Sequence, residues 1–461
     1  MINKKNAGFI LGILLGLSIW MAPLAGLPEE GRKCLAMSLV AVVWWATNCM
    51  HPGYTSLALL LGYSLLLDPA IAPASLIFRI WTTPMLYLVV GGFLIAAAVS
   101  GSRLGERMAL WLIYRFVNSY RGIIVFCYLM GFLLSFLIPH PWPRSFLILS
   151  VISHIIKEAG LEEKWAQNIG LAIFAGSVPT ASILLTGDSI LNTAATEFAG
   201  QSLSWLDWVI YMGVPGALAS ILTCLLQIKL FGEPPLGVSV NRNAIRGQLE
   251  QLGSLTLLEK KTIFIIGGAI LLWAADSLHG IPVGWVALGA AILLSTPFVG
   301  ALDAHSWQQV NPGTLFFLCA ALSIGTVGAE TGMNAWLAEI MLPSQAPTNP
   351  YIFALIAAGI GMTLHMVIGS SLAALGVVSP AIVAFGISAG LPPIVPAMIA
   401  YTAVTLHWLL PFHHMNLLIG LGENGGKYDE KMVFKLGFCQ TGVIVVVVLF
   451  QVFWWSLIGV L

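Results

Sequence analysis

Long apolar runs, separated by short polar segments, make up most of this chain. A helix of about 20 apolar residues crosses the roughly 30 Å hydrocarbon core of a bilayer. Repeated runs of that kind predict an all-α polytopic membrane protein. We expect the first run, which follows two lysines, to be a retained transmembrane helix rather than a cleaved signal peptide. The runs lie near residues 8–26, 34–49, 53–71, 83–100, 109–117 with 122–139, 169–185, 205–230, 260–276, 281–301, 313–342, 351–368, 395–411 and 434–460.

The composition narrows the class of protein further. Of the 461 residues, 58% are hydrophobic and only 9% are charged, against about 25% charged residues in a soluble domain. So few charges exclude a cytosolic enzyme, a disordered chain and a nucleic-acid-binding protein, and they make membrane lipid the expected surroundings. The six cysteines lie singly, without a CxxC spacing, so we expect neither a metal site nor a disulfide framework.

One long polar connection divides the chain into two similar halves. We predict an N-terminal half over 1–230, a linker over 231–261 and a second half over 262–461. Basic residues in the linker and near the N-terminus place both in the cytoplasm by the positive-inside rule. The expected location is therefore the cell inner (cytoplasmic) membrane, crossed several times.

Each half interrupts its apolar runs twice, in the same order. The first half breaks at 138–145 and again before Asn192, and the second breaks at 368–373 and again before Asn416. Such breaks leave backbone groups without helical partners, and in a membrane those groups suit a ligand or an ion. The pattern predicts two inverted repeats, with about 11 transmembrane helices and two re-entrant hairpins, as in secondary transporters.

Several short strings, taken in order, resemble one family over nearly the whole chain. Residues 44–47 (Trp-Trp-Ala-Thr) are similar to its W-W-I-T-E stretch, residues 329–332 (Ala-Glu-Thr-Gly) to its E-x-T-G turn, and 201–208 to the segment after its first broken helix. Asn192 and Asn416 fall at the Asn of its two Thr-Pro-Pro-Asn breaks. The chain thus resembles the divalent anion:sodium symporter family, which contains the sodium–dicarboxylate cotransporters.

This resemblance implies an architecture and a partner. A transport domain of hairpins and broken helices would move past a scaffold domain, formed by helices near 34–100 and 281–342, in an elevator mechanism. The scaffold would also form a homodimer.

The site motifs of the family are altered in this chain. Its two Ser-Asn-Thr tips correspond to His140-Pro141-Trp142 and Ser370-Ser371-Leu372, and its Thr-Pro-Pro-Asn breaks to residues 189–192 and 413–416. In the family these positions hold sodium and the substrate carboxylate. The fold therefore carries over better than sodium coupling or dicarboxylate specificity.

The residues at the tips and breaks are the candidates for function. Asp188 is ionisable at membrane depth, which favours a functional role, although Asp is also a common helix cap. The histidines titrate near neutral pH, yet they could equally bind loose carbonyls or, less in keeping with their adjacent positions, a metal. Arg144 could hold an anion or extend to the lipid headgroups. The predicted substrate-binding residues are His140, Pro141, Trp142, Arg144, Asn192, Ser370, Ser371, His413, His414 and Asn416, and the predicted coupling-ion residues are Asp188, Ser189, Asn192, Ser370 and His413.

These observations together predict a secondary active transporter. Its substrate would be a small anion, either a di- or tricarboxylate or an inorganic divalent anion, and the coupling ion Na⁺ or H⁺, with no other cofactor. An uncoupled facilitator or channel is one alternative, and a non-transporting membrane enzyme or receptor on the same fold is another. No HExxH or phosphate-loop motif occurs, so an enzyme is not expected.

Overall fold

The computed structural model describes residues 4–158, 160–200, 203–235, 242–341, 346–422 and 425–461. Within these ranges the chain is helical and contains no β-strand. The first half holds α1 (Lys4–Met21), α2 (Glu29–Thr47), α3 (Pro52–Leu66), α4 (Ala74–Ile77), α5 (Pro84–Gly101), α6 (Leu104–Phe116), α7 (Tyr120–Leu133), α8 (Pro141–Glu158), α9 (Glu163–Ala181), α10 (Leu191–Phe198), α11 (Trp205–Trp208) and α12 (Val214–Phe231).

The rest of the chain repeats this all-helical construction. It holds α13 (Arg242–Gln251), α14 (Leu257–Ala274), α15 (Asp276–His279), α16 (Val283–Ser295), α17 (Pro312–Glu330), α18 (Met333–Met341), α19 (Pro350–Ile368), α20 (Ser371–Ser388), α21 (Ile394–Thr405), α22 (Met415–Ile419) and α23 (Glu430–Leu457). Short 3-10 segments are η1 (Arg79–Thr82), η2 (Leu134–Phe136), η3 (Leu185–Gly187), η5 (Ser306–Gln309) and η6 (Pro411–His413), and η4 (Val209–Gly213) is a π-helical turn.

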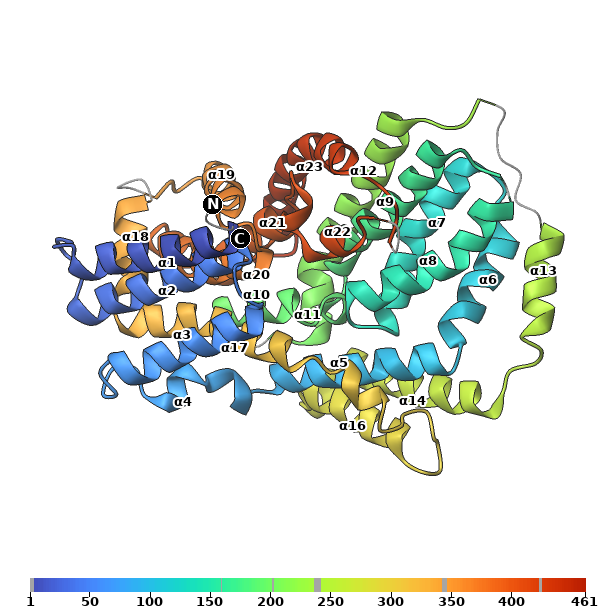
Figure 1. Ribbon diagram of the computed structural model, residues 1–461, viewed down its shortest axis with the longest axis horizontal. Coiled ribbons are helices and arrows are strands. Elements are labelled where there is room, and N and C mark those ends of the chain that lie inside the picture. Colours follow the sequence, from blue (N-terminus) through green and yellow to red (C-terminus); the bar gives the residue numbers. More distant parts are fainter. Residues whose placement is uncertain (1–3, 159, 201–202, 236–241, 342–345, 423–424) are drawn as a thin grey trace.

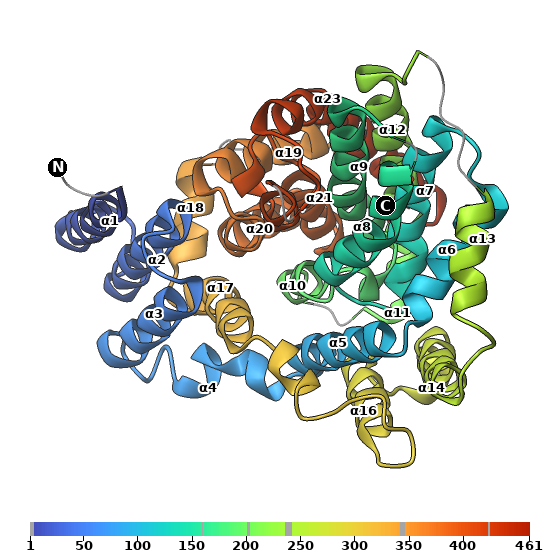
Figure 2. The same cartoon turned by 45° about the vertical axis from the view of Figure 1, so that its right-hand side comes forward.

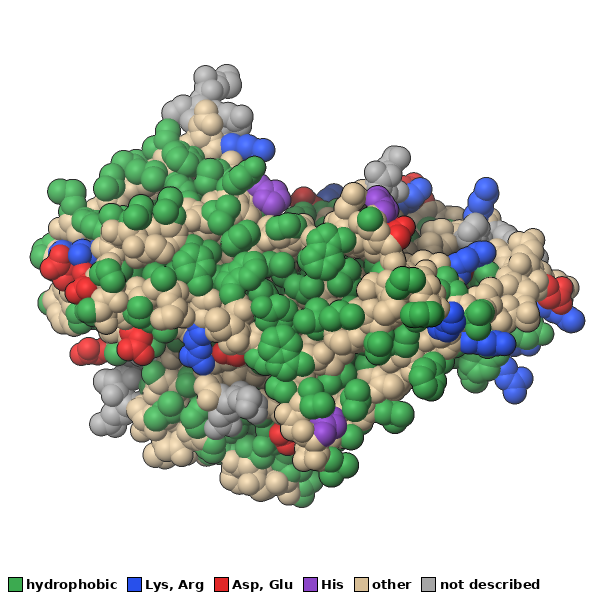
Figure 3. Space-filling view, turned by 90° about the horizontal axis from the view of Figure 1, so that it is seen from below, with side chains coloured by type: hydrophobic (Ala, Val, Ile, Leu, Met, Phe, Trp, Pro, Cys, Tyr) green, Lys and Arg blue, Asp and Glu red, His purple; other side chains and the backbone are tan. Residues whose placement is uncertain are grey.

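The described helices include membrane-spanning lengths of apolar sequence. Six helical stretches are long and apolar enough to cross a bilayer, and four shorter apolar helices accompany them. Hydrophobic side chains also cover the middle of the face drawn in Figure 3, with most of the charged groups toward its two ends. The protein is therefore a polytopic, multi-pass membrane protein, while the number of about 11 crossings stays a prediction. The six stretches are Pro84–Gly101, Trp205–Phe231, Ser306–Glu330, Pro350–Ile368, Ser371–Ser388 and Glu430–Leu457.

Two elements differ from the expected pattern. The apolar run near 313–342 forms two helices, α17 and α18, because Gly332 takes a left-handed conformation (φ +77°) between them, which glycine adopts without strain. The polar linker contains a helix of its own, α13, whose one buried side chain is that of Ile245.

The helices gather into two groups (Figures 1 and 2). In one group α2 and α3 pack together, α17 packs on α3, and α5 lies along α16 beside α14. In the other, α7 packs on α9, α12 on α9 and α23, and α19, α20 and α21 pack on each other. α17, from the first group, also packs on α20, from the second. The tips and breaks named from the sequence lie in the second group.

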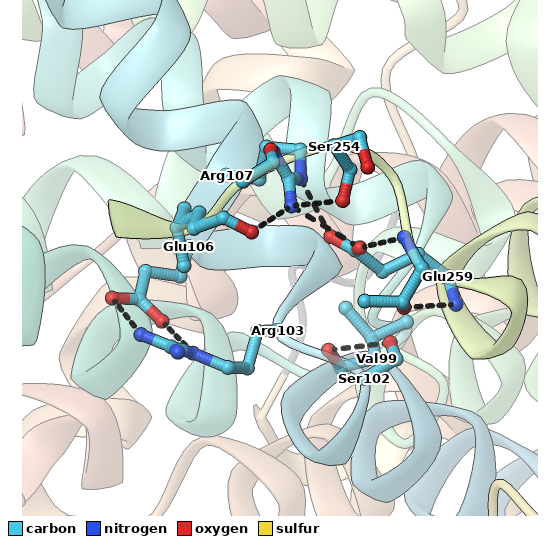
Figure 4. Close-up of polar contacts among 10 residues, drawn as sticks. Val99, Ser102, Arg103, Glu106, Arg107, Ser254 and Glu259 are labelled. Atoms are coloured by element: carbon cyan, nitrogen blue, oxygen red, sulfur yellow. Dashed lines mark hydrogen bonds and ion pairs between the residues drawn. The ribbon is translucent and has the colours of Figure 1, made fainter. Parts of the chain in front are cut away.

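The end of the linker is fastened to α6 by an ionic cluster (Figure 4). Nε of Arg107 lies 2.6 Å from Oε1 of Glu259, and the same guanidinium donates to the carbonyl oxygens of Leu252 (3.1 Å) and Gly253 (2.8 Å). Glu259 in turn accepts from the backbone N–H of Thr256 (2.7 Å), which completes a capping box at the start of α14. One arginine therefore joins α6, the end of the linker and α14.

Candidate functional site

Each half contains a pair of helices that meet at a sharp tip. The first pair is α7, extended by η2, with α8, and residues 137–140 separate them; the second is α19 with α20, separated by Gly369 and Ser370. Gly369 has a φ of +73° and donates its N–H to the carbonyl oxygen of His365 (2.8 Å), which closes α19. The tips predicted near 140 and 370 are therefore places where the helices reverse.

Each half also contains an interrupted helix. The first stops at Ala181 and resumes as α10, and the second stops at Thr405 and resumes as α22. A fully buried asparagine stabilises each interruption. The side-chain amide of Asn192 donates to the carbonyl oxygens of Ala181 and Leu184 (both 2.9 Å), and that of Asn416 donates to the carbonyl oxygen of Phe174 (2.6 Å). Asn192 thus binds carbonyl groups left open where the first helix stops, whereas Asn416 joins the second break to the carbonyl oxygen of Phe174 within α9.

Arg144 lies inside the first break and is fully buried. Its Nη1 donates to the carbonyl oxygens of Ile138 at the tip (2.9 Å) and Gly187 in the break (2.5 Å). Its Nε and Nη2 have no hydrogen-bond partner among the described residues. The guanidinium is therefore a fixed cation that joins tip and break, and it does not reach the lipid headgroups.

The three predicted histidines all accept a backbone hydrogen bond at Nδ1. His140 accepts from the N–H of Trp142 (3.3 Å), His414 from that of Asn416 (3.3 Å), and His413 from those of residues 409 and 410 (3.0 and 3.1 Å). A nitrogen that accepts an amide proton carries none itself, so these rings hold their hydrogen on Nε2. They act as neutral donors in this arrangement, and binding an added proton would break the helix caps.

Asp188 combines capping with a free oxygen. Its Oδ1 accepts from the backbone N–H groups of Ile190 (3.0 Å) and Leu191 (3.2 Å) at the start of α10. Within the described chain no donor contacts Oδ2, although the residue is only 5% exposed. The carboxylate therefore caps α10 and keeps one oxygen for another partner.

A cavity of about 310 Å³ lies where the tips and breaks meet the first group of helices. Seven predicted residues line it, namely His140, Pro141, Trp142, Asp188, Ser370, Ser371 and His414. The other predicted residues lie behind the wall in buried positions: Arg144, Ser189, Asn192, His413 and Asn416. No Lys or Arg lines the cavity in the described part of the chain.

The opposite wall comes from residues that the sequence analysis did not select. α2 supplies Trp45 and α17 supplies Phe317, while His51 and Asn311 lie directly before α3 and α17. His51 and Asn311 each cap a helix that begins with proline. A capping residue before proline predicts the N-terminus of a helix. The pattern does not predict that this N-terminus faces a ligand cavity.

Two further histidines lie beside the second break. The ring of His365 lies 5.7 Å from that of His407 and 5.5 Å from that of His413, and its Nε2 is 3.0 Å from the carbonyl oxygen of His413. Ser371 donates to the same carbonyl (2.9 Å). Among the described residues, no group of three or more His, Cys, Asp or Glu side chains could hold a metal ion.

Comparison with known proteins agrees with this architecture. The family model of the sodium:sulfate symporter transmembrane region matches residues 3–461. A membrane protein of Cupriavidus necator is 22% identical over 466 residues, covering 94% of this chain and 89% of that protein. The sodium-dependent dicarboxylate transporter SdcS of Staphylococcus aureus is 24% identical over 488 residues, covering 97% of this chain and 91% of that protein. The resemblance inferred from the sequence is therefore confirmed: the chain belongs to the sodium:sulfate symporter family, whose members are membrane transporters and not enzymes.

Proposed function

We propose that this protein is a secondary active transporter of a small anion across the inner membrane, with its N-terminus in the cytoplasm and Na⁺ or H⁺ as the coupling ion. Membership of the family supports transport, and the relatives named for dicarboxylates make these the first substrates to assay. The cavity is the proposed binding site, because both tips and both breaks reach it.

The observation that carries the proposal is the uncapped start of α20 at this cavity. Within the described chain no side chain caps α20, and the N–H groups of Ser371 and Leu372 have no acceptor. Free amides at a helix N-terminus bind anions. The Nε2–H groups of His140 and His414 add two neutral donors, since both residues line the same cavity. An anion can thus bind without a lysine or arginine in the wall.

Asp188 is the proposed coupling group. A substrate anion next to an ionised carboxylate is repelled unless a cation accompanies it, and the free Oδ2 is the place for Na⁺ or H⁺ to bind. Arg144 already binds the carbonyl groups of the first tip and the first break, so a mobile cation at this break is needed only by the free oxygen of Asp188. If the coupling ion is H⁺, His365 is a further candidate because its Nδ1 has no partner among the described residues.

The proposed cycle is of the elevator type. The cavity has one wall from α2, α3 and α17 and another from the tips and breaks. We propose that the second group, with its hairpins re-entrant and its repeats inverted, moves as the transport domain past the first group. The first group would be the scaffold of a homodimer.

Uptake into liposomes containing the purified protein tests this proposal. Labelled succinate, sulfate and butyrate would each be offered with an inward Na⁺ gradient, with an inward H⁺ gradient, and with neither. We expect at least one anion to accumulate against its own gradient when a cation gradient is present, and Asp188→Asn to abolish the accumulation. Uptake that only equilibrates the substrate would establish a facilitator, and uptake of none of these anions under any gradient would refute the proposal.

A further inference from the structure

The two helix tips at the cavity differ in the hydrogen-bond donors that they offer to a ligand. At the second tip the first turn of α20 offers the amides of Ser371 and Leu372, and the hydroxyl of Ser370 has no hydrogen-bond partner among the described residues. This end can bind one acidic group of a substrate through neutral donors and the helix dipole.

The first tip offers the Nε2–H of His140 but no free backbone amide in the first turn of its helix. Pro141 and Pro143 stand in the first turn of α8 and have no N–H, and the N–H of Trp142, between them, is donated to His140 (3.3 Å). The first turn of this helix therefore leaves no amide for a second acidic group.

The neighbouring start of α10 is closed to anions as well. The carboxylate of Asp188 accepts from the amides of Ile190 and Leu191, so the helix already holds a negative group. Asp188 is 95% buried, lines the cavity and has an oxygen without a donor among the described residues. While no coupling cation occupies this oxygen, a second carboxylate of a substrate would approach it and be repelled.

The rest of the wall favours an apolar body. Trp142 lines the cavity beside the first tip, and Trp45, Phe317 and Phe412 line it as well. The faces and edges of such rings gain most from flat or aliphatic groups. A short dicarboxylate leaves this surface without a partner.

We infer that the substrate carries one anionic group, bound at the start of α20, and an apolar or aromatic body that contacts Trp142. This inference rests on the proposed function, because it takes the cavity to be the transport site. It departs from the divalent anions expected from the sequence, and its physical basis is the unequal supply of donors at the two tips.

Ligands that differ in the number of charges and in the size of the apolar body test the inference on the unmodified protein. Dissociation constants would be measured by titration calorimetry at pH 7.5 for butyrate, succinate, 4-phenylbutyrate, sulfate and the neutral butyramide, each in NaCl and in choline chloride. We expect butyrate to bind about tenfold more tightly than succinate, and phenylbutyrate about tenfold more tightly than butyrate. Butyramide should not bind, because it lacks the charge that the helix start attracts.

Two variants show which residue causes each difference in affinity. Asp188→Asn should strengthen succinate binding about tenfold more than butyrate binding, and Trp142→Ala should remove the advantage of phenylbutyrate. Asp303→Asn, in an exposed loop, is the matched control and should change none of these constants. If either of these variants fails to fold, the dissociation constants of the ligands for the unmodified protein still test the inference about substrate class.

The outcomes separate the two proposals. Succinate binding as tightly as butyrate, or more tightly, would overturn the inference about substrate class and leave the anion transporter standing. Binding of none of the four anions would overturn the proposed function as well. Butyramide binding as tightly as butyrate would show that charge is not recognised, which also contradicts both.

Discussion

Arg144→Met is the most informative single substitution in this protein. Methionine matches the unbranched aliphatic stem of arginine but removes the charge and the donors. The change would leave the carbonyl groups of Ile138 and Gly187 without the donors seen at 2.9 and 2.5 Å in a fully buried place.

The expected loss of stability follows from these two contacts. An unsatisfied buried acceptor costs about 1–3 kcal/mol, so two cost about 2–6 kcal/mol. Arg144 itself has two buried nitrogens without partners among the described residues. Removing these unpaired donors offsets part of the destabilisation. We therefore expect a net destabilisation of about 2–4 kcal/mol.

A mobile cation should replace the lost one. If Na⁺ enters the place left by the guanidinium, saturation at 100 times its dissociation constant restores about 2.7 kcal/mol. The assay is the apparent melting temperature in detergent, followed by the fluorescence of the 16 tryptophans, in NaCl and in choline chloride of equal ionic strength. Arg107→Met is the control, because Arg107 also binds backbone carbonyls but lies outside the breaks.

The reasoning would be refuted by either of two results. One is a loss of stability below about 1 kcal/mol, which is less than a single orphaned acceptor costs. The other is an increase in melting temperature from Na⁺ that is no larger in the variant than in the unmodified protein. This would show that the space left by the guanidinium does not bind a cation.

The other predictions concern stability and are checked by denaturant or thermal unfolding in detergent. In a double-mutant cycle, Arg107→Ala alone should lower the free energy of unfolding by about 3–5 kcal/mol, because it leaves the buried carboxylate of Glu259 without its partner. Adding Glu259→Gln should restore part of that free energy, and strictly additive effects would contradict the ion pair between Arg107 and Glu259. Asn192→Ala should cost about 2–4 kcal/mol, since it strands two or more carbonyl groups, whereas Tyr401→Phe, which removes one 2.6 Å hydrogen bond to the same asparagine, should cost about 1 kcal/mol; equal costs would contradict this ranking. Gly284→Ala should separate α16 from α5 and destabilise by about 1–3 kcal/mol, because its Cβ would lie 1.8 Å from the first carbonyl oxygen of α5; an unchanged melting temperature would show that the contact is not tight.

The fold could be predicted from the sequence because the bilayer imposes simple rules. Apolar runs had to be helices, and their interruptions had to be protected inside protein. Asn192 lies just after the first interruption and binds carbonyl groups left open there. Asn416 lies just after the second and binds the carbonyl oxygen of Phe174 in α9. The division of 313–342 into two helices required the backbone conformation of a single glycine.

The candidate site could be predicted only in part. Residues adjacent to a tip, such as Trp142 and Ser370, line the cavity because the chain reverses there. Arg144 also lies near a tip but points into the break, and this direction depends on the carbonyl group of Gly187, 43 positions away. His51 and Asn311 join the wall from helices distant in sequence, and a pattern read along one chain does not say which helix starts share a cavity.

The presence of both Arg144 and Asp188 at the first break has an electrical consequence. Moving one elementary charge through 100 mV takes about 2.3 kcal/mol, but these two buried side chains have formal charges of opposite sign and sum to zero. A transport domain that carries them together, loaded with one monovalent anion and one coupling cation, crosses the membrane without electrical work. In the proposed cycle, turnover then follows concentrations alone and is indifferent to voltage. Such a transporter passes no net current. Its activity is therefore measured by tracer flux, and an electrophysiological recording would show no transport current.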